Sequence, residues 1–116
     1  EDVDVYAIEA IPALAEATRE RLERLGYGDI HTRVGDGYYG WPEHAPYDAT
    51  IVTAAPETVP PPLKRQLAIG GRLVIPLGPP HGYQVLWRFV KEPDGALRGE
   101  GGNVHDVQFE VPARIP

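Results

Sequence analysis

The spacing of apolar residues in the first third of the chain predicts a strand, a helix and a second strand. Residues 3–9 (VDVYAIE) are rich in β-branched and aromatic side chains, which predicts a buried strand that ends at Glu9. Over residues 12–25, apolar side chains recur at three- and four-residue intervals, which predicts a helix with one apolar face and one solvated, charged face. The helix starts at a proline and stops before Gly26, and both residue types suit those places. Residues 30–34 form the next short predicted strand.

A further strand, helix and strand follow. Residues 47–53 (YDATIVT) are nearly all apolar, as in a parallel strand that packs on both faces. A short helix is predicted over residues 60–68, ended by Gly70 and Gly71. Residues 72–77 (RLVIPL) again have the composition of a buried strand.

After residue 82 the pattern changes to one typical of antiparallel strands. Residues 83–91 alternate in character, Asp94-Gly95 is a hairpin turn dipeptide, and residues 96–102 are predicted to pair back. A last strand is predicted over residues 104–111.

Alternating strands and a helix predict an α/β sheet with right-handed crossovers, extended by an antiparallel tail. We therefore expect one domain over residues 1–116, with an αβ part at 1–78 and antiparallel strands at 79–116. Ligands of such sheets bind at the carboxyl ends of the strands. Those ends carry small or acidic residues, which let a polar ligand approach closely: Glu9-Ala10, Gly35-Asp36-Gly37, Thr53-Ala54-Ala55 and Leu77-Gly78.

Composition narrows the chemistry. The 116 residues include 11 basic and 17 acidic side chains, and the formal net charge of −6 argues against a nucleic-acid partner. No apolar run approaches the ~20 residues of a membrane span, so no membrane partner is expected. The chain has no cysteine and no serine, which excludes thiol catalysis and a Ser-His-Asp triad and fits a cytoplasmic location. Its 4 histidines lack metal-ligand spacing, so no metal site is predicted.

Residues 35–40 (GDGYYG) formally match the G-x-G-x-x-G pattern of dinucleotide-binding loops. That loop must open a helix whose N-terminus faces a pyrophosphate, yet Pro42 and Pro46 disfavour a regular helix here, and Asp36 would repel the phosphates. An acidic loop that binds an uncharged or cationic ligand is the better interpretation. Glu9 fits either a carboxylate that accepts hydrogen bonds from a ribose diol or a solvated acid at a strand end, and spacing alone does not separate the two.

Taken together, the strand ending at Glu9 and the segments LERLGY, GDGYYGWPEHAPYD, IVTAA and GGRLVIPLG, in this order, resemble the protein-L-isoaspartate O-methyltransferase family from about Val5 to Gly78. The resemblance implies a Rossmann-like fold and S-adenosylmethionine as methyl donor. It implies that Glu9 and the adjacent Ala10 bind the ribose and that Asp36 and Gly37 contact the adenine. It further implies that Thr53 lies beside the methionine moiety.

The same resemblance implies a substrate: the α-carboxylate of an L-isoaspartyl residue in a damaged protein or peptide. Ala54, Ala55, Phe109 and Val111 are the residues expected beside it. That carboxylate is already ionised at neutral pH, because carboxyl pKa values lie near ~3.5. A sulfonium is a good leaving group, so alignment and exclusion of water suffice and no general base is required.

The chain departs from the family pattern in two places. The family's first, central strand and its glycine-rich donor loop precede the strand that ends at Glu9, and the chain begins at Glu1 without a methionine. We therefore expect a C-terminal portion of a methyltransferase, with the missing segment supplied by the rest of a longer chain or by another chain. The family tail approximates V-x-F-V-P, whereas Glu110 intervenes here. Two alternatives stay open: a non-catalytic Rossmann-like module used for interaction, and a related methyltransferase that modifies aspartates of a dedicated peptide partner.

Overall fold

The computed structural model describes residues 3–103 and 113–115. The chain divides into two compact units, Glu1–Trp41 and Pro42–Pro116, each of which is described by itself. The predicted subdivision at residue 78 stays a prediction. None of the helices in the described part of the chain is long and apolar enough to cross a membrane.

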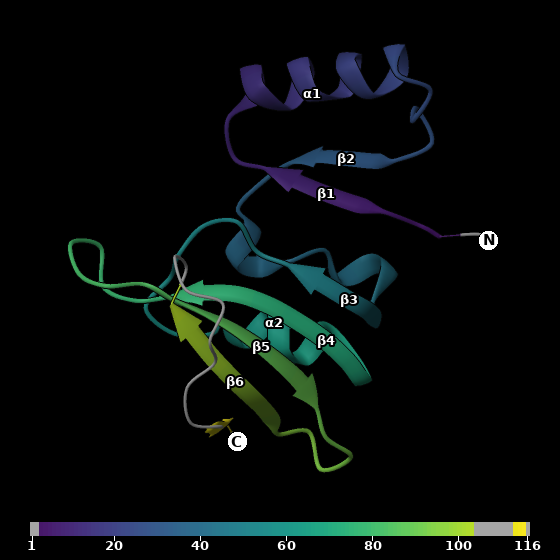
Figure 1. Ribbon diagram of the computed structural model, residues 1–116. Helices are drawn as coiled ribbons and strands as arrows, with labels where there is room; N and C mark the ends of the chain where they lie inside the picture. The colour runs from purple at the N-terminus through teal and green to yellow at the C-terminus, as the bar shows by residue number, and fades with distance from the viewer. Residues whose placement is uncertain (1–2, 104–112, 116) are drawn as a thin grey trace. The chain divides into compact units, whose positions relative to one another are not determined.

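The first unit is a strand–helix–strand motif (Figure 1). Strand β1 (Tyr6–Glu9) pairs in parallel with β2 (His31–Val34), and α1 (Pro12–Arg24) connects them and lies along the pair. The helix has proline in its first turn, and Gly26 after it adopts a φ of 88°, a left-handed conformation that glycine adopts without strain. The strand, helix and strand predicted for this region are all present.

Burial in the first unit is lower than predicted. Within residues 3–41, Ala15 is the one apolar side chain that is buried, whereas Ile11 and Leu14 on the predicted apolar face of α1 are about half exposed, at 53% and 52%. Strand β1 is half-buried rather than buried, because within this unit it is paired with β2 along one edge only.

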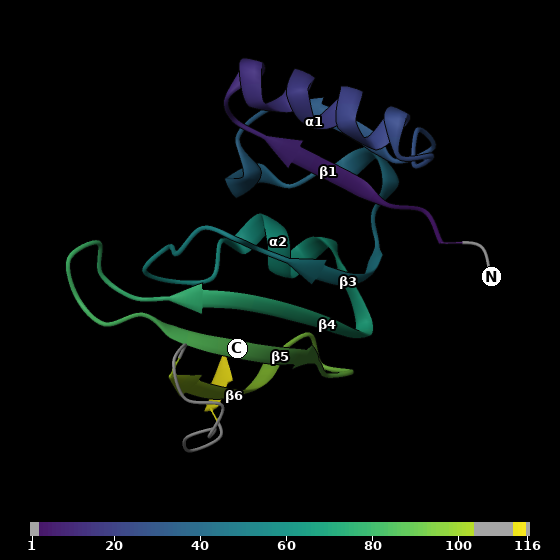
Figure 2. The ribbon, with the colours of Figure 1, turned by 45° about the horizontal axis from the view of Figure 1, so that its top comes forward.

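The second unit is a sheet of mixed direction. Its strands lie in the order β3-β4-β5-β6-β7, of which β3 and β4 are parallel and the later pairs antiparallel. Short helix α2 lies against one face of β4 in both views (Figures 1 and 2). The elements are η2 (Pro42–His44), β3 (Tyr47–Ile51), α2 (Pro61–Gln66), β4 (Leu67–Leu77), β5 (Val85–Lys91), β6 (Leu97–Asn103) and β7 (Ala113–Ile115).

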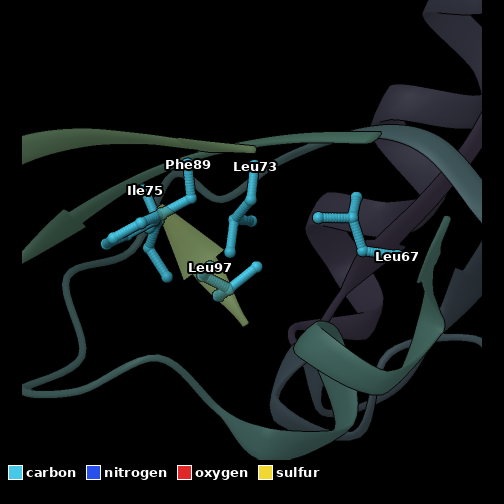
Figure 3. Packing of buried hydrophobic residues seen from close by; sticks show 5 residues of the cluster. All are labelled: Leu67, Leu73, Ile75, Phe89 and Leu97. Atoms are coloured by element: carbon cyan, nitrogen blue, oxygen red, sulfur yellow. The ribbon is translucent and has the colours of Figure 1, made fainter. Parts of the chain in front are cut away.

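The core of the second unit is built from side chains of this sheet, against which Val52 and Val59 of the segment after β3 pack. Figure 3 shows four of its side chains pointing toward one another, with Leu67 at the edge of the group. Two glycines of β6 make room for aromatic rings of β5: Gly99 is the register partner of Phe89, and Gly101 that of Trp87. The two rings stack with centroids 5.4 Å apart. The fully buried side chains are Leu67, Leu73, Ile75, Phe89 and Leu97.

Two sequence-based predictions in the second unit are wrong in detail. Residues 47–53 do not form a strand buried on both faces: Ile51 is 74% exposed, because the described part of the unit pairs β3 with β4 along one edge only. The predicted helix over residues 60–68 stops at Gln66, where β4 begins. Gly70 and Gly71 lie inside β4, at a shift of register against β3, rather than ending a helix.

The Asp94-Gly95 turn and the pairing of β5 with β6 are confirmed. The strand predicted over residues 104–111 falls outside the described residues.

Lysine 91 at the end of β5 stabilises α2. Its Nζ donates hydrogen bonds to the backbone oxygens of Lys64 and Leu67, each at 2.9 Å. Lys64 lies in the last turn of α2, where its oxygen also accepts from the Leu67 N–H, and Leu67 is the residue at which α2 gives way to β4. The positive charge of Lys91 also interacts favourably with the negative, C-terminal end of the α2 dipole.

Candidate functional site

The carboxyl ends of β1 and β2 bring the first group of predicted site residues together. Glu9 and Val34 are register partners, and the Gly35 N–H donates to the Glu9 backbone oxygen at 3.0 Å. The loop that carries Asp36 and Gly37 therefore leaves the sheet directly beside Glu9. The cause is the parallel pairing, which places the carboxyl ends of both strands on the same side of the sheet.

The Glu9 side chain is half-buried and lies at the start of α1. Its Oε1 accepts a long hydrogen bond, 3.4 Å, from the backbone N–H of Ile11. Ala10 beside it is exposed and too small to shield it. Glu9 also lines a hollow of about 180 Å³ between α1 and the two strands. This volume is below the ~300–1,000 Å³ of enclosed ligand pockets, so the site within this unit is an open strand edge.

The loop over residues 35–40 folds into a single 3₁₀ turn, η1 (Gly37–Tyr39). Asp36 caps this turn: its Oδ1 accepts from the Tyr38 N–H at 2.9 Å. A regular helix, which a pyrophosphate-binding loop would open, is not formed here, in agreement with the sequence analysis. Asp36 is exposed, and no heavy atom lies within 4 Å of the position of a Cβ on Gly37. The turn is therefore accessible on the side of Asp36 and Gly37.

Sequence analysis missed Arg33 as a residue of this region. Its Nη2 donates to the Gly40 backbone oxygen at 3.3 Å, and its guanidinium lies over the ring of Trp41 at 4.5 Å. A cationic side chain on a short strand usually reaches solvent, so the type of residue gave no indication. The spacing did give an indication: Arg33 lies two residues after His31, on the same strand face, and just before an aromatic-rich loop.

The predicted residues of the second unit follow β3. The Val52 N–H donates to the Val74 oxygen at 2.9 Å, and Thr53 and Ala54 beyond it are exposed, whereas Ala55 is half-buried. The Gly78 N–H, just after β4, donates to the Pro56 oxygen at 3.1 Å. The two parallel strands thus present their loops at one edge of their sheet.

Phe109 and Val111, the other predicted substrate-binding residues, lie outside the described residues. In the part of the chain that the structure describes, no three His, Cys, Asp or Glu side chains are grouped closely enough to hold a metal ion.

A charge cluster on α1 lies apart from these strand ends. Arg19 forms ion pairs with Glu16 and, at 2.7 Å, with Glu23. The hydrogen bond from the Arg19 guanidinium holds the pKa of the Glu16 carboxyl below its ordinary value. All three side chains are about half exposed, so the cluster is the solvated helix face that the sequence predicts.

Comparison with known proteins identifies the family. The sequence profile of the family described as protein-L-isoaspartate(D-aspartate) O-methyltransferase matches residues 1–113. A protein-L-isoaspartate O-methyltransferase of Nitrosospira multiformis is 55% identical over 93 residues, which are 80% of this chain and 39% of that protein. One of Syntrophobacter fumaroxidans is 53% identical over 94 residues, 81% of this chain and 38% of that protein. The chain thus spans less than half the length of these relatives.

Solved structures agree on the fold. One protein-L-isoaspartate O-methyltransferase matches with a TM-score of 0.76 at 30% identity, and the match covers 97% of this chain and 33% of that protein's chain. Another, from Plasmodium falciparum in complex with S-adenosyl-L-homocysteine, matches with a TM-score of 0.72 at 23% identity. That match covers 91% of this chain and 50% of the Plasmodium chain. The α/β, Rossmann-like fold class is confirmed by these neighbours. The chain belongs to the protein-L-isoaspartate(D-aspartate) O-methyltransferase family.

Proposed function

We propose that this chain takes part in S-adenosylmethionine-dependent methyl transfer to the α-carboxylate of L-isoaspartyl residues in damaged proteins. The observation that carries the proposal is the pair of acidic side chains, Glu9 and Asp36, on adjacent carboxyl ends of parallel strands in a chain of this family. Acidic acceptors at that edge suit a nucleoside, which offers hydroxyl and amino donors.

The first unit would hold the adenosine half of the donor. The Glu9 carboxylate, of which Oε1 makes only a long bond to Ile11, accepts hydrogen bonds from the ribose hydroxyls. Asp36 and the open side of Gly37 contact the adenine, and Ala10 leaves room beside the ribose. When bound, the donor supplies a methyl group activated by a positively charged sulfur. Acidic residues suit that charge, whereas they would repel a diphosphate.

The second unit would contribute to the methionine and substrate side. Thr53 lies beside the methionine moiety, and Ala54 and Ala55 leave space for the substrate carboxylate, because their side chains are small and the loop is largely exposed. Phe109 and Val111 complete the substrate contacts in this proposal. The carboxylate is the nucleophile and is ionised without help, so the residues need to align it and to exclude water. The backbone nitrogen of the next residue then attacks the methyl ester and expels methanol to form a succinimide, and hydrolysis of this ring restores some normal aspartate.

The proposal includes a further strand and a glycine-rich donor loop, supplied by the rest of a longer chain or by another chain. Within the described residues, β1 has one neighbouring strand, β2, and β3 has one, β4, so in this proposal the further strand would pair with the other edge of β1 or β3. The chain's share of its relatives' length, 39% and 38% in the two described above, supports the same proposal.

Calorimetric titration with S-adenosylhomocysteine tests donor binding. We expect the wild-type chain to bind and Glu9→Gln to bind at least tenfold more weakly, since a hydrogen bond to a charged group contributes about 1.5–3 kcal/mol. Glu20→Gln, an exposed acid on α1, is the matched control and should bind like the wild type. No binding by the wild type would contradict donor binding by this chain on its own.

Methyl transfer to an isoaspartyl peptide, with the aspartyl peptide of the same sequence as control, tests the substrate. We expect label from the methyl donor to enter the isoaspartyl peptide alone. Equal methylation of both peptides would contradict the repair function and favour a methyltransferase of ordinary aspartates.

A further inference from the structure

Four side chains of the first unit form a cluster at the base of the loop over residues 35–40. Tyr6 on β1 and its register partner His31 on β2 stack with ring centroids 4.6 Å apart and planes 11° apart. The ring of Trp41, just after the loop, meets Tyr6 edge-on at 5.2 Å. The Arg33 guanidinium lies 4.5 Å from the centre of the Trp41 ring. We call these four residues the aromatic cluster.

The aromatic cluster holds the second end of the loop to the sheet. Arg33 both covers Trp41 and donates to the Gly40 backbone oxygen at 3.3 Å. Gly40 is buried and has φ 66° and ψ −152°, a conformation that residues with a Cβ rarely adopt. The position of Gly40 therefore suits glycine alone, and the hydrogen bond from Arg33 attaches it to β2.

The first end of the loop is held independently. The Gly35 N–H is hydrogen-bonded to the Glu9 oxygen at 3.0 Å, and inside the loop Asp36 caps the Tyr38 N–H at 2.9 Å. With one end fixed by β1 and the other by the aromatic cluster, the short loop has little freedom left. Fixing both ends of a binding loop lowers the entropy that a ligand must otherwise remove.

We propose that Arg33 and Trp41 are positioning residues for donor binding: they fix the loop over residues 35–40 so that Asp36 and Gly37 meet the nucleoside in one arrangement. Neither side chain is assigned a contact with the donor. The inference rests on the proposed function, since it assumes that this loop binds the nucleoside.

Titration of the full chain with S-adenosylhomocysteine measures the effect on binding. We expect Trp41→Leu and Arg33→Gln each to raise the Kd about tenfold, because each removes one attachment of the loop. Trp41→Phe, which retains a ring for the cation, should recover most of the affinity, and Arg33→Lys should recover part of it. Tyr27→Leu replaces an aromatic residue that is 58% exposed on the same unit but outside the cluster, and should leave the Kd unchanged.

Amide hydrogen exchange of the ligand-free chain separates this inference from the proposed function. Trp41→Leu and Arg33→Gln should speed exchange at Gly40, whose N–H bonds to the Gly37 oxygen at 3.1 Å, and leave β5 and β6 as in the wild type. Unchanged exchange at Gly40 would overturn the inference. So would an unchanged Kd of Trp41→Leu and Arg33→Gln, if the wild type binds the ligand. A wild-type chain that binds no ligand contradicts donor binding by this chain on its own, and exchange at Gly40 then decides by itself whether the cluster fixes the loop.

Discussion

Replacing Gly99 by alanine tests the packing of the second unit at its tightest point. A Cβ at this position of β6 would lie 2.5 Å from Cε1 of Phe89, closer still to Cδ1, and 3.1 Å from the Arg88 backbone oxygen. Ordinary contacts of this kind are 3.4–4 Å. The Phe89 ring is fully buried and stacked on Trp87, so it has no open space into which it could move.

The expected cost follows from two opposing effects. Overpacking a core costs about 1–3 kcal/mol, and a ring that must shift by roughly an ångström within a buried stack belongs near the upper end. Alanine in place of glycine also restricts the unfolded chain, which stabilises the folded state by about 0.4–1 kcal/mol. The free energy of unfolding should therefore fall by about 2 kcal/mol, and the thermal midpoint by about 10 °C.

Thermal and urea unfolding followed by far-ultraviolet circular dichroism measure this change. Gly37→Ala is the matched control, since no neighbouring group lies within 4 Å of its Cβ position, and it should be as stable as the wild type or more stable by up to about 1 kcal/mol. Shortening the ring with Phe89→Leu in the Gly99→Ala background should cost less than the sum of the two single changes, because the collision is then gone. A Gly99→Ala chain as stable as the wild type would refute the packing argument.

Three further predictions concern single contacts. Lys91→Met removes the hydrogen bonds to the backbone oxygens of Lys64, Arg65 and Leu67 where α2 ends, and should lower the free energy of unfolding by about 1–2 kcal/mol, measured by urea unfolding. Gly95→Ala places a Cβ at a φ of 89° in open space, so backbone strain alone should cost about 1 kcal/mol in the same assay. Arg19 lowers the pKa of Glu16 in the folded chain, so this pair stabilises the fold above the ordinary pKa of a glutamate, and its contribution is lost as the pH falls through the lowered value. Arg19→Gln should move the Glu16 titration midpoint upward in a carboxyl-detected NMR titration, whereas an unmoved midpoint would contradict the assigned cause.

Sequence patterns predicted the elements of the first unit well because local rules dominate there. Proline at the start of α1 and Gly26 after it define the helix by backbone geometry alone. The close approach of Glu9 to the loop carrying Asp36 also follows from the sequence, since two parallel strands joined by one helix end at the same edge.

Elements whose residues fit two structures were predicted less well. Leu67 and Ala68 suit a helix as well as a strand, and two glycines end a helix as readily as they shape an irregular strand. The burial of Leu67 in the core of the second unit, together with pairing to β3, decides for the strand. Such tertiary contacts carry no local pattern, and the same is true of the Arg33 guanidinium over Trp41.

The uneven burial of the chain bears on its ligand affinity. Residues 3–41 bury one apolar side chain, Ala15, so the free energy needed to open this unit is small. In the proposed function, Glu9 and Asp36 can bind the nucleoside only while the unit is folded, so the observed Kd is the intrinsic Kd divided by the folded fraction of the unit. On that proposal, a segment that covered Ile11 and Leu14 would stabilise the folded unit and so tighten nucleoside binding without contacting the nucleoside.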